Sequence, residues 1–226
     1  MNKNVIVFAA HPDDEALGCG GTLACHIDNG DNVFVVFMSD GVTSRNVNGG
    51  EGEELSLRNK SAYESCNIIG FRKPEFVNFP DNRMDTIALL DVVQKVEYFI
   101  NKYKPSIIYT HYQNDLNIDH QITYRAVMTA CRPQPNFCVK EIYSFEVSSS
   151  TEWSLSSSGS AFNPKKFVDI STTLDRKLNA LEAYSAEMRD FPHSRSIDAI
   201  KALSIYRGAS VGVKFAEAFQ IERVIS

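Results

Sequence analysis

Two uninterrupted apolar runs, separated by a segment of helical length, constrain the fold of this chain more than any other feature. The first run covers residues 4–10 and the second covers residues 33–38, and both are rich in valine and phenylalanine. Continuous apolar runs of this length are typical of strands covered on both faces of a parallel sheet. The segment 15–27 between them is long enough for a helix, and residues 28–31, Asp-Asn-Gly-Asp, are typical of a helix end and a turn. The sequence therefore predicts a β-α-β unit.

The same alternation continues along the chain. We expect further strands at 76–79, 106–110, 140–147, 167–170 and 219–225, and further helices at 55–70, 86–103, 173–188 and 197–207. The glycine-rich segment 39–54 and the serine-rich segment 148–160 are predicted loops. Strands that alternate with long helices predict an α/β fold, a Rossmann-like three-layer sandwich with a mostly parallel sheet.

The chain length predicts a single domain over residues 1–226. Residues 1–147 would form the sheet core with a metal site, and residues 148–226 the serine-rich loop with the C-terminal helices and strand. Oligomeric state is not encoded in these patterns, so a homo-oligomer stays open.

Composition excludes several classes of protein. A formal charge of −5 provides no basic surface for nucleic acid. The five cysteines form no C-x-x-C pair, which favours a reducing, cytoplasmic location over a disulfide framework. The apolar run near the N-terminus is too short for a signal peptide or a membrane span.

A dense group of ionisable residues follows the first predicted strand. His11, Asp13, Asp14 and Glu15 place one imidazole and three carboxylates within five residues. Ligands in open parallel sheets bind beyond the carboxyl ends of the strands, where these residues should lie. The carboxylates would repel one another there unless a cation lay among them. A helix N-cap, the plainer interpretation, does not need two adjacent aspartates and a histidine.

A second group, residues 111–120, follows the strand predicted at 106–110 and contains two histidines and two aspartates. The two groups can face each other across one crevice at the edge of the sheet. Two imidazoles and one carboxylate with an open position suit a catalytic zinc, whose bound water is acidified. Pro12 fixes the backbone before Asp13, so that the adjacent carboxylates can take different roles.

These residues resemble the PIG-L/LmbE-like N-deacetylases, which act on acetylated glucosamine conjugates. The resemblance rests mainly on residues 10–22 (Ala-His-Pro-Asp-Asp-Glu-Ala-Leu-Gly-Cys-Gly-Gly-Thr) and residues 115–120 (Asp-Leu-Asn-Ile-Asp-His). Arg58, residues 79–83 and residues 216–219 extend it over nearly the whole chain. The family fold is also a Rossmann-like sheet.

The resemblance implies a role for each matching residue. His11, Asp14 and His120 would bind the zinc. Asp13 would act as the general base, and Asp119 would orient a neighbouring side chain. Arg58 would contact the substrate.

This chain departs from the family at Asn117, where several members have a histidine three residues before the last ligand. An amide can donate a hydrogen bond to a developing oxyanion but cannot protonate an amine. We therefore expect Asp13 to carry the proton in both steps, with His111 as a weaker alternative. His111 and Tyr112 are also expected near the substrate, Tyr112 by stacking on a sugar ring.

The predicted function is zinc-dependent hydrolysis of an N-acyl group, most simply N-acetyl, from an amino sugar or its nucleotide or glycan conjugate. Fe²⁺ or Co²⁺ could occupy the same ligands. Two alternatives stay open at this stage: a non-haem iron(II) oxygenase that uses a His-x-Asp and a distant histidine, and a metal- or sugar-binding module with weak catalysis.

Overall fold

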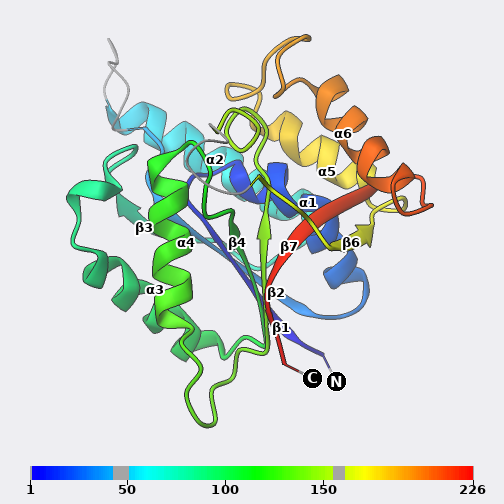
Figure 1. The fold of residues 1–226 in the computed structure, drawn as a ribbon. Helices are drawn as coiled ribbons and strands as arrows, with labels where there is room; N and C mark the ends of the chain where they lie inside the picture. The colour runs from blue at the N-terminus through cyan, green and yellow to red at the C-terminus, as the bar shows by residue number, and fades with distance from the viewer. Residues whose placement is uncertain (1, 43–50, 155–160, 226) are drawn as a thin grey trace.

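A seven-stranded sheet forms the centre of the fold in the computed structural model, which describes residues 2–42, 51–154 and 161–225 (Figure 1). The strands are β1 (Asn4–Ala9), β2 (Asn32–Ser39), β3 (Glu75–Phe79), β4 (Ile107–His111), β5 (Glu141–Phe145), β6 (Lys166–Asp169) and β7 (Ala216–Val224). Their order in space is β3-β2-β1-β4-β5-β7-β6. Strands β1 to β5 pair in parallel, whereas β7 is antiparallel to β5 and β6. The prediction of a mostly parallel sheet is confirmed.

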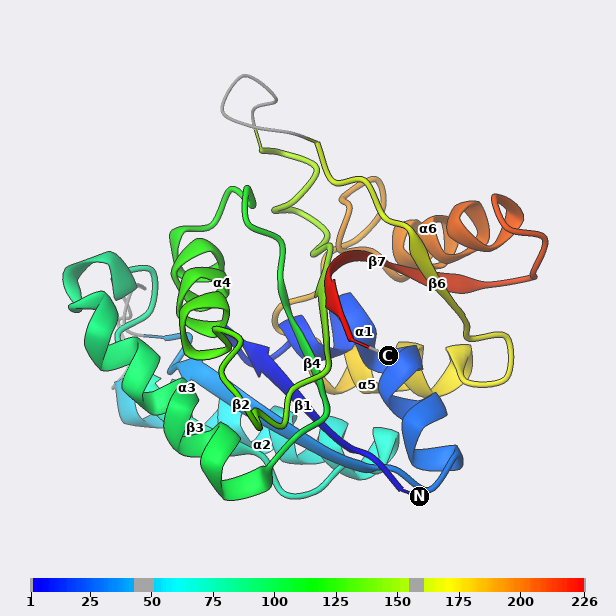
Figure 2. The same cartoon turned by 60° about the horizontal axis from the view of Figure 1, so that its bottom comes forward.

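Helices cover both faces of the sheet, which confirms the three-layer prediction (Figure 2). The helices are α1 (Asp14–Asp28), α2 (Glu51–Ile69), the 3₁₀ turn η1 (Met84–Thr86), α3 (Leu89–Tyr103), α4 (Ile118–Ala130), α5 (Leu174–Ala183) and α6 (Ile197–Ala209). Helices α3 and α4 lie on one face, and α1, α2 and α5 lie on the other. Among the residues described, no helix is both long and apolar enough to cross a membrane.

Side chains that point alternately to the two faces of the buried strands fill the core on both sides of the sheet. In β1, Val5 and Val7 pack with the α1 side, whereas Ile6 and Phe8 pack with the α3 and α4 side. Successive side chains of a strand point to opposite faces. A strand between two helical layers therefore needs an apolar residue at every position, which is the pattern in residues 4–10.

The helix boundaries that differ most from the predictions are the starts of α2 and α3 and the end of α5. Helix α2 begins at Glu51 and not near residue 55, and Glu54 in its first turn suits the positive end of a helix dipole. Helix α3 begins at Leu89 because the extended backbone of Ile87 separates it from η1. Helix α5 ends at Ala183. The backbone amides of Tyr184 and Ser185 donate to carbonyl oxygens three residues earlier, and not four as in an α-helix. Parts of both predicted loops, 43–50 and 155–160, lie outside the described residues.

The order of the strands reverses between β1 and β4. From β1 the chain proceeds outward through β2 to β3, and it then returns to place β4 on the other side of β1. After β1 the chain continues into α1 on one face of the sheet, and after β4 it continues into α4 on the other face. Ligands of open parallel sheets bind beyond the carboxyl ends of the strands at such a point. Both groups of residues singled out in the sequence begin at this point.

A buried ion pair fixes the middle of α1 against the C-terminal strand. The Glu217 carboxylate in β7 accepts hydrogen bonds from the backbone amides of Gly21 (3.0 Å) and Thr22 (2.7 Å). Lys177 of α5 donates to the same carboxylate at 2.5 Å and to the carbonyl oxygen of Leu17 at 2.8 Å. These bonds join α1, α5 and β7, so the segment after residue 147 holds the helix that carries Asp14.

Gly18 allows α1 to lie directly against the sheet. A Cβ atom at this position would stand 2.2 Å from Cδ2 of Phe145, a fully buried ring in β5. A Cβ atom on Gly20, on another side of the helix, would make an ordinary contact of 3.5 Å with Lys177.

We predict that Gly18→Ala lowers the free energy of unfolding by about 1–3 kcal/mol, because the buried ring of Phe145 has to move. Urea denaturation measures this change. Gly20→Ala is the matched control and should be neutral or stabilising by up to about 1 kcal/mol, since alanine favours the helix. Equal stability of the two variants would refute the close approach at Gly18.

Candidate metal centre and active site

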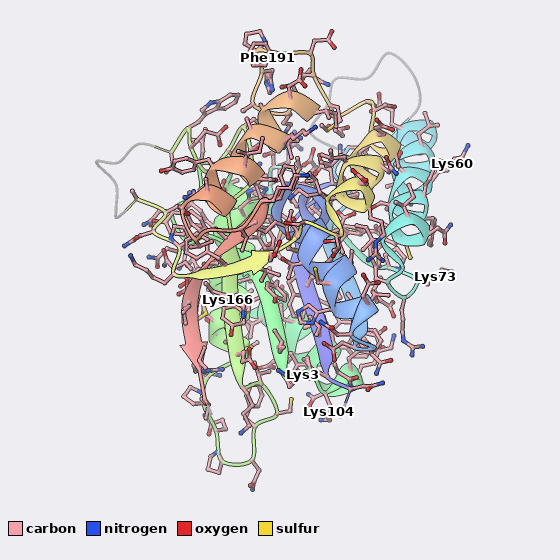
Figure 3. The ribbon with its side chains drawn as sticks, turned by 90° about the vertical axis from the view of Figure 1, so that its right-hand side faces the viewer. Lys3, Lys60, Lys73, Lys104, Lys166 and Phe191 are labelled. Carbon is pink, nitrogen blue, oxygen red and sulfur yellow. The ribbon has the colours of Figure 1, made fainter. Side chains whose placement is uncertain are left out.

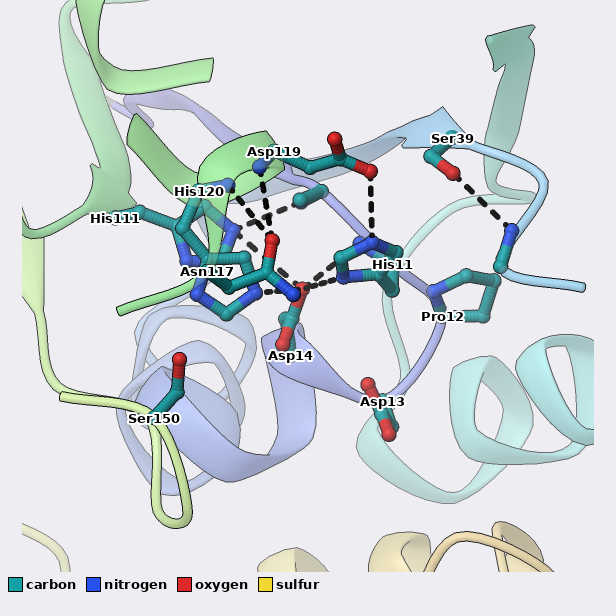
Figure 4. Close-up of polar contacts among 12 residues, drawn as sticks. His11, Pro12, Asp13, Asp14, Ser39, His111, Asn117, Asp119, His120 and Ser150 are labelled. Atoms are coloured by element: carbon teal, nitrogen blue, oxygen red, sulfur yellow. Dashed lines mark hydrogen bonds and ion pairs between the residues drawn. The ribbon is translucent and has the colours of Figure 1, made fainter. Parts of the chain in front are cut away.

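The side chains of His11, Asp14 and His120 converge where the strand order reverses (Figure 4). His11 follows β1, Asp14 begins α1, and His120 lies in the first turn of α4. The Oδ2 atom of Asp14 is 3.3 Å from Nδ1 of His11 and 3.4 Å from Nε2 of His120. All three residues are buried. The structure therefore brings together the three side chains that the sequence analysis assigned to a metal.

The electrostatics of this group fit a divalent cation. Burial alone would lower the pKa of His11, but the carboxylates of Asp119, Asp14 and Asp81 outweigh it and raise the pKa well above its ordinary value. Burial likewise opposes a charge on His120, yet Asp14 and Asp115 raise its pKa to about 9. The imidazoles would thus attract protons to balance buried carboxylates. A metal ion supplies the same compensation and leaves the histidines as neutral ligands.

One carboxylate oxygen of Asp14 is unsatisfied among the described residues. Its Oδ2 accepts a hydrogen bond from the backbone amide of His11 at 2.8 Å, whereas its buried Oδ1 has no hydrogen-bond partner within the described part of the chain. Buried carboxylate oxygens are ordinarily satisfied by donors or by metal ions. This unsatisfied oxygen is a second observation in favour of a cation beside Asp14.

Two carboxylates hold the far side of the His11 ring. Nε2 of His11 lies 3.1 Å from Oδ2 of Asp119 and 3.1 Å from Oδ1 of Asp81. Asp119 is itself fixed by the backbone amides of Asn82 (2.7 Å) and Met84 (3.0 Å). A carboxylate on one ring nitrogen sets the tautomer and directs the other nitrogen to the metal. The sequence analysis gave this orienting role to Asp119 and gave Asp81 none.

Asp115 holds the second histidine. Its Oδ1 atom lies 3.0 Å from Nδ1 of His120, and Oδ2 accepts a hydrogen bond from Thr151 at 2.6 Å. Ser150 donates a short hydrogen bond to the same carboxylate. Burial would raise the pKa of Asp115, but His120 and the two hydroxyl groups lower it to about 2. The turn after residue 147 thus supports the metal site through Asp115, a residue that sequence reasoning left without a function.

Asp13 occupies a strained backbone position beside the three candidate ligands. Its φ angle of +129° is rare for a residue with a side chain, and the side chain makes no helix-capping hydrogen bond. The N-cap interpretation therefore fails. Oδ2 accepts a hydrogen bond from Arg195 at 2.9 Å, whereas the buried Oδ1 is unpaired among the described residues. Burial raises the pKa of Asp13, and the cations of Arg195 and Arg58 offset this only in part.

Two arginines from distant segments support Asp13. Arg58 of α2 lies 3.7 Å from its Oδ2, donates to the carbonyl oxygen of Pro12 at 3.1 Å, and pairs with Glu187 at 2.9 Å. Arg58 is thus engaged with the turn that carries Asp13, which is a positioning role different from the expected contact with substrate. Arg195, from the loop before α6, was missed because an isolated loop arginine carries no pattern in the sequence.

Glu15, the third carboxylate of the motif, faces the helices and not the candidate ligands. It accepts hydrogen bonds from Ser65 and Tyr184, both at 2.8 Å, and from the backbone amide of Asp13 at 3.1 Å. Burial raises the pKa of Glu15 to about 7, although these hydrogen bonds oppose the shift. Glu15 therefore ties α2 and the end of α5 to the strained turn at Asp13.

Asn117 is the N-cap of α4. Its Oδ1 accepts hydrogen bonds from the amides of Asp119 (2.8 Å) and His120 (3.4 Å), and its Nδ2 donates to Oδ1 of Asn82 at 3.0 Å. Capping fixes the first turn of α4, which carries both Asp119 and His120. An amide nitrogen has two hydrogens, so the second one is left for a ligand.

The expected substrate contacts of His111 and Tyr112 conflict with their burial. Nε2 of His111 accepts a hydrogen bond from the amide of Ala10 at 2.8 Å, and burial lowers the pKa of His111 to about 3. The ring also stacks on His120 with centroids 3.9 Å apart. His111 is therefore unsuited to protonate an amine and instead supports His120. Tyr112 packs edge-on against Phe162 and is 2% exposed, so its ring cannot stack on a sugar.

The buried group of His11, Asp14 and His120 lies at the switch point of the sheet, with Asp13 beside it. This arrangement is typical of an enzyme with a catalytic metal site. The family model described as PIG-L, GlcNAc-PI de-N-acetylase, matches residues 6–131. The chain belongs to this family, as the resemblance implied.

A curated relative supports the same assignment. The chain is 28% identical over 192 residues to a probable N-acetyl-alpha-D-glucosaminyl L-malate deacetylase 2 from Bacillus cereus, with 83% of this chain and 84% of that protein covered. The predicted activity, N-deacetylation of an amino-sugar compound, is confirmed at this level. The iron(II) oxygenase and the binding module receive no support.

Solved structures confirm the fold. A diacetylchitobiose deacetylase from Pyrococcus horikoshii superposes with a TM-score of 0.76 at 21% identity, covering 98% of this chain and 84% of that one. A 4-carboxy-2-hydroxymuconate hydratase from Pseudomonas putida gives 0.79 at 20% identity, covering 99% and 98%. Because one fold accommodates both activities, function has to be argued from the site.

We predict that Asp119→Asn lowers metal affinity roughly 10- to 100-fold, because the amide no longer fixes the orientation of His11 through a charged contact. Competition with a chromogenic chelator measures the affinity. Asp85→Asn, an exposed position on η1, is the matched control and should bind metal like the wild type. Undiminished affinity in Asp119→Asn would show that the contact with His11 is incidental.

Proposed function

We propose that this chain is a zinc-dependent N-deacetylase in which His11, Asp14 and His120 hold the metal and Asp13 transfers the protons. The observation that carries the proposal is the convergence of Nδ1 of His11, Oδ2 of Asp14 and Nε2 of His120 beside a buried aspartate whose side chain makes no capping hydrogen bond. Two imidazole nitrogens and one carboxylate oxygen are a donor set typical of catalytic zinc with an open position. Iron(II) and cobalt(II) accept the same donors.

A zinc ion at this position would polarise the amide carbonyl and acidify a bound water. The other steps fall to the protein. The Oδ1 of Asp13, unpaired among the described residues, can accept the proton of the attacking water, because burial raises the pKa of this carboxyl above its ordinary value. Arg195 holds Oδ2 and thereby fixes which oxygen is available.

The same Asp13 is the proposed donor to the departing amine. Asn117 cannot supply a proton, and His111 is buried with its Nε2 occupied by the amide of Ala10. An Asp13 that has taken the proton from water can return it to the amine, so one residue balances both steps. The second hydrogen of Asn117 Nδ2 is available to the carbonyl oxygen as it gains negative charge.

The proposed substrate is an N-acetylated amino sugar in a small conjugate or oligosaccharide. The names of the Bacillus relative and the Pyrococcus structure support this class, with a malate-linked sugar in one and a chitin disaccharide in the other. A cytoplasmic location stays a prediction, and the five unpaired cysteines support it.

We predict that Asp13→Asn lowers the turnover number roughly 10²- to 10⁴-fold while the zinc content stays unchanged, because the substitution removes a proton acceptor and not a ligand. Acetate release from N-acetylglucosamine, free and conjugated, measures turnover, and metal analysis measures zinc. Asp28→Asn, at the exposed C-terminal end of α1, is the control and should retain full activity. Undiminished acetate release by Asp13→Asn would disprove the assignment of the base.

A further inference from the structure

Two aromatic side chains from separate segments meet outside the metal centre. Trp153 belongs to the turn 147–154, and His193 belongs to the loop 184–196 between α5 and α6. Their ring centroids are 5.6 Å apart at an interplanar angle of 79°, an edge-to-face contact. Trp153 is 50% exposed. Among the described residues, half of the Trp153 side chain is therefore accessible to a ligand.

Each of the two segments is anchored to one side of the metal centre. In the turn 147–154, Thr151 donates to Asp115, which contacts His120. In the loop 184–196, Arg195 donates to Asp13. The aromatic pair therefore joins the two segments that contact the proposed base and the partner of the last candidate ligand.

The two segments are also joined directly. Arg195 donates to the hydroxyl oxygen of Ser149 at 2.6 Å and to the carbonyl oxygen of Ser148 at 3.3 Å. Figures 1 and 2 both show the loop between α5 and α6 beside the segment that follows β5. Trp153 is thus held in place by its neighbours on the chain and by His193, which reduces the entropy lost when a ligand binds.

The charges near the pair favour a neutral ligand over an anionic one. Neither segment contains lysine, and Arg189, the other arginine of the loop 184–196, donates to the carbonyl oxygens of Ala186 and Met188. Figure 3 shows Phe191, at the tip of this loop, far from Lys3 and Lys104. Arg195 is engaged by Asp13 and the two serines. Glu152 and Asp190 lie in the same segments and would repel phosphate.

We propose that Trp153, backed by His193, stacks on the pyranose ring next to the sugar that carries the reacting N-acetyl group. The apolar C–H face of a pyranose matches the open face of an indole ring. The pair would then select oligosaccharides over single amino sugars. This proposal rests on the proposed function and identifies a second sugar subsite for it.

Trp153 is the single tryptophan of the chain, so its fluorescence reports this position alone. The titration uses zinc-loaded Asp13→Asn protein, in which the amide keeps an oxygen acceptor for Arg195 and turnover is suppressed. We expect N,N'-diacetylchitobiose to change the emission and N-acetylglucosamine to leave it unchanged. Unchanged emission at saturating disaccharide overturns the proposal. A response to UDP-N-acetylglucosamine alone assigns the ring to a nucleobase and also overturns it.

Steady-state kinetics provide an independent test. Trp153→Ala should raise the KM for N,N'-diacetylchitobiose about 10-fold, leave its kcat within about twofold, and leave N-acetylglucosamine kinetics unchanged. Trp153→Phe should restore most of the affinity. Tyr98→Ala, an exposed aromatic residue on α3, is the matched control and should behave like the wild type.

Failure of this proposal is distinguishable from failure of the proposed function. If the wild type releases acetate and Trp153→Ala leaves the KM for the disaccharide unchanged, the deacetylase stands and the stacking subsite is refuted. If the fluorescence responds to the disaccharide but the wild type releases no acetate, Trp153 binds sugar and the deacetylase, with the subsite defined relative to its reacting group, is refuted.

Discussion

The concentration of buried negative charge at the reversal of strand order is the constraint on which the rest of the structure depends. Five aspartates lie buried around two histidines, namely Asp13, Asp14, Asp81, Asp115 and Asp119. Unpaired buried carboxylates are strongly destabilising. The protein offsets the negative charge of these carboxylates with different partners, and the partners of a carboxylate indicate its role at the site.

Asp119 is held by two backbone amides, Asp115 by two hydroxyl groups, and Asp13 by the guanidinium of Arg195. Asp14 is surrounded by imidazoles and retains an oxygen without a hydrogen-bond donor among the described residues. A cation beside Asp14 would complete the compensation. The assembly links segments from residue 11 to residue 195, so the site depends on the whole fold and not on one motif.

The sheet and the three candidate ligands were predictable from the sequence because their signals are local. Apolar runs such as residues 4–10 identify covered strands, and His11 and Asp14 directly follow one of them. Asp115, Asp81 and Arg195 were not assigned, since their roles arise from contacts between segments far apart in the chain. His111 and Tyr112 show the reverse case, and their contact with substrate stays a prediction that burial does not support. Their position beside a ligand in sequence suggested access to substrate, but the strand end buries both side chains.

The fold alone does not decide the chemistry, because a hydratase shares it with the deacetylases. The central claim is that a metal ion at His11, Asp14 and His120 is required for hydrolysis of an N-acetyl group. Acetate release from an N-acetylated amino-sugar conjugate by metal-stripped protein, measured as zinc is added stepwise, tests it most directly. The account predicts no release from the stripped protein and a rise that stops at about one equivalent of zinc. Release at an equal rate before any zinc is added would contradict it.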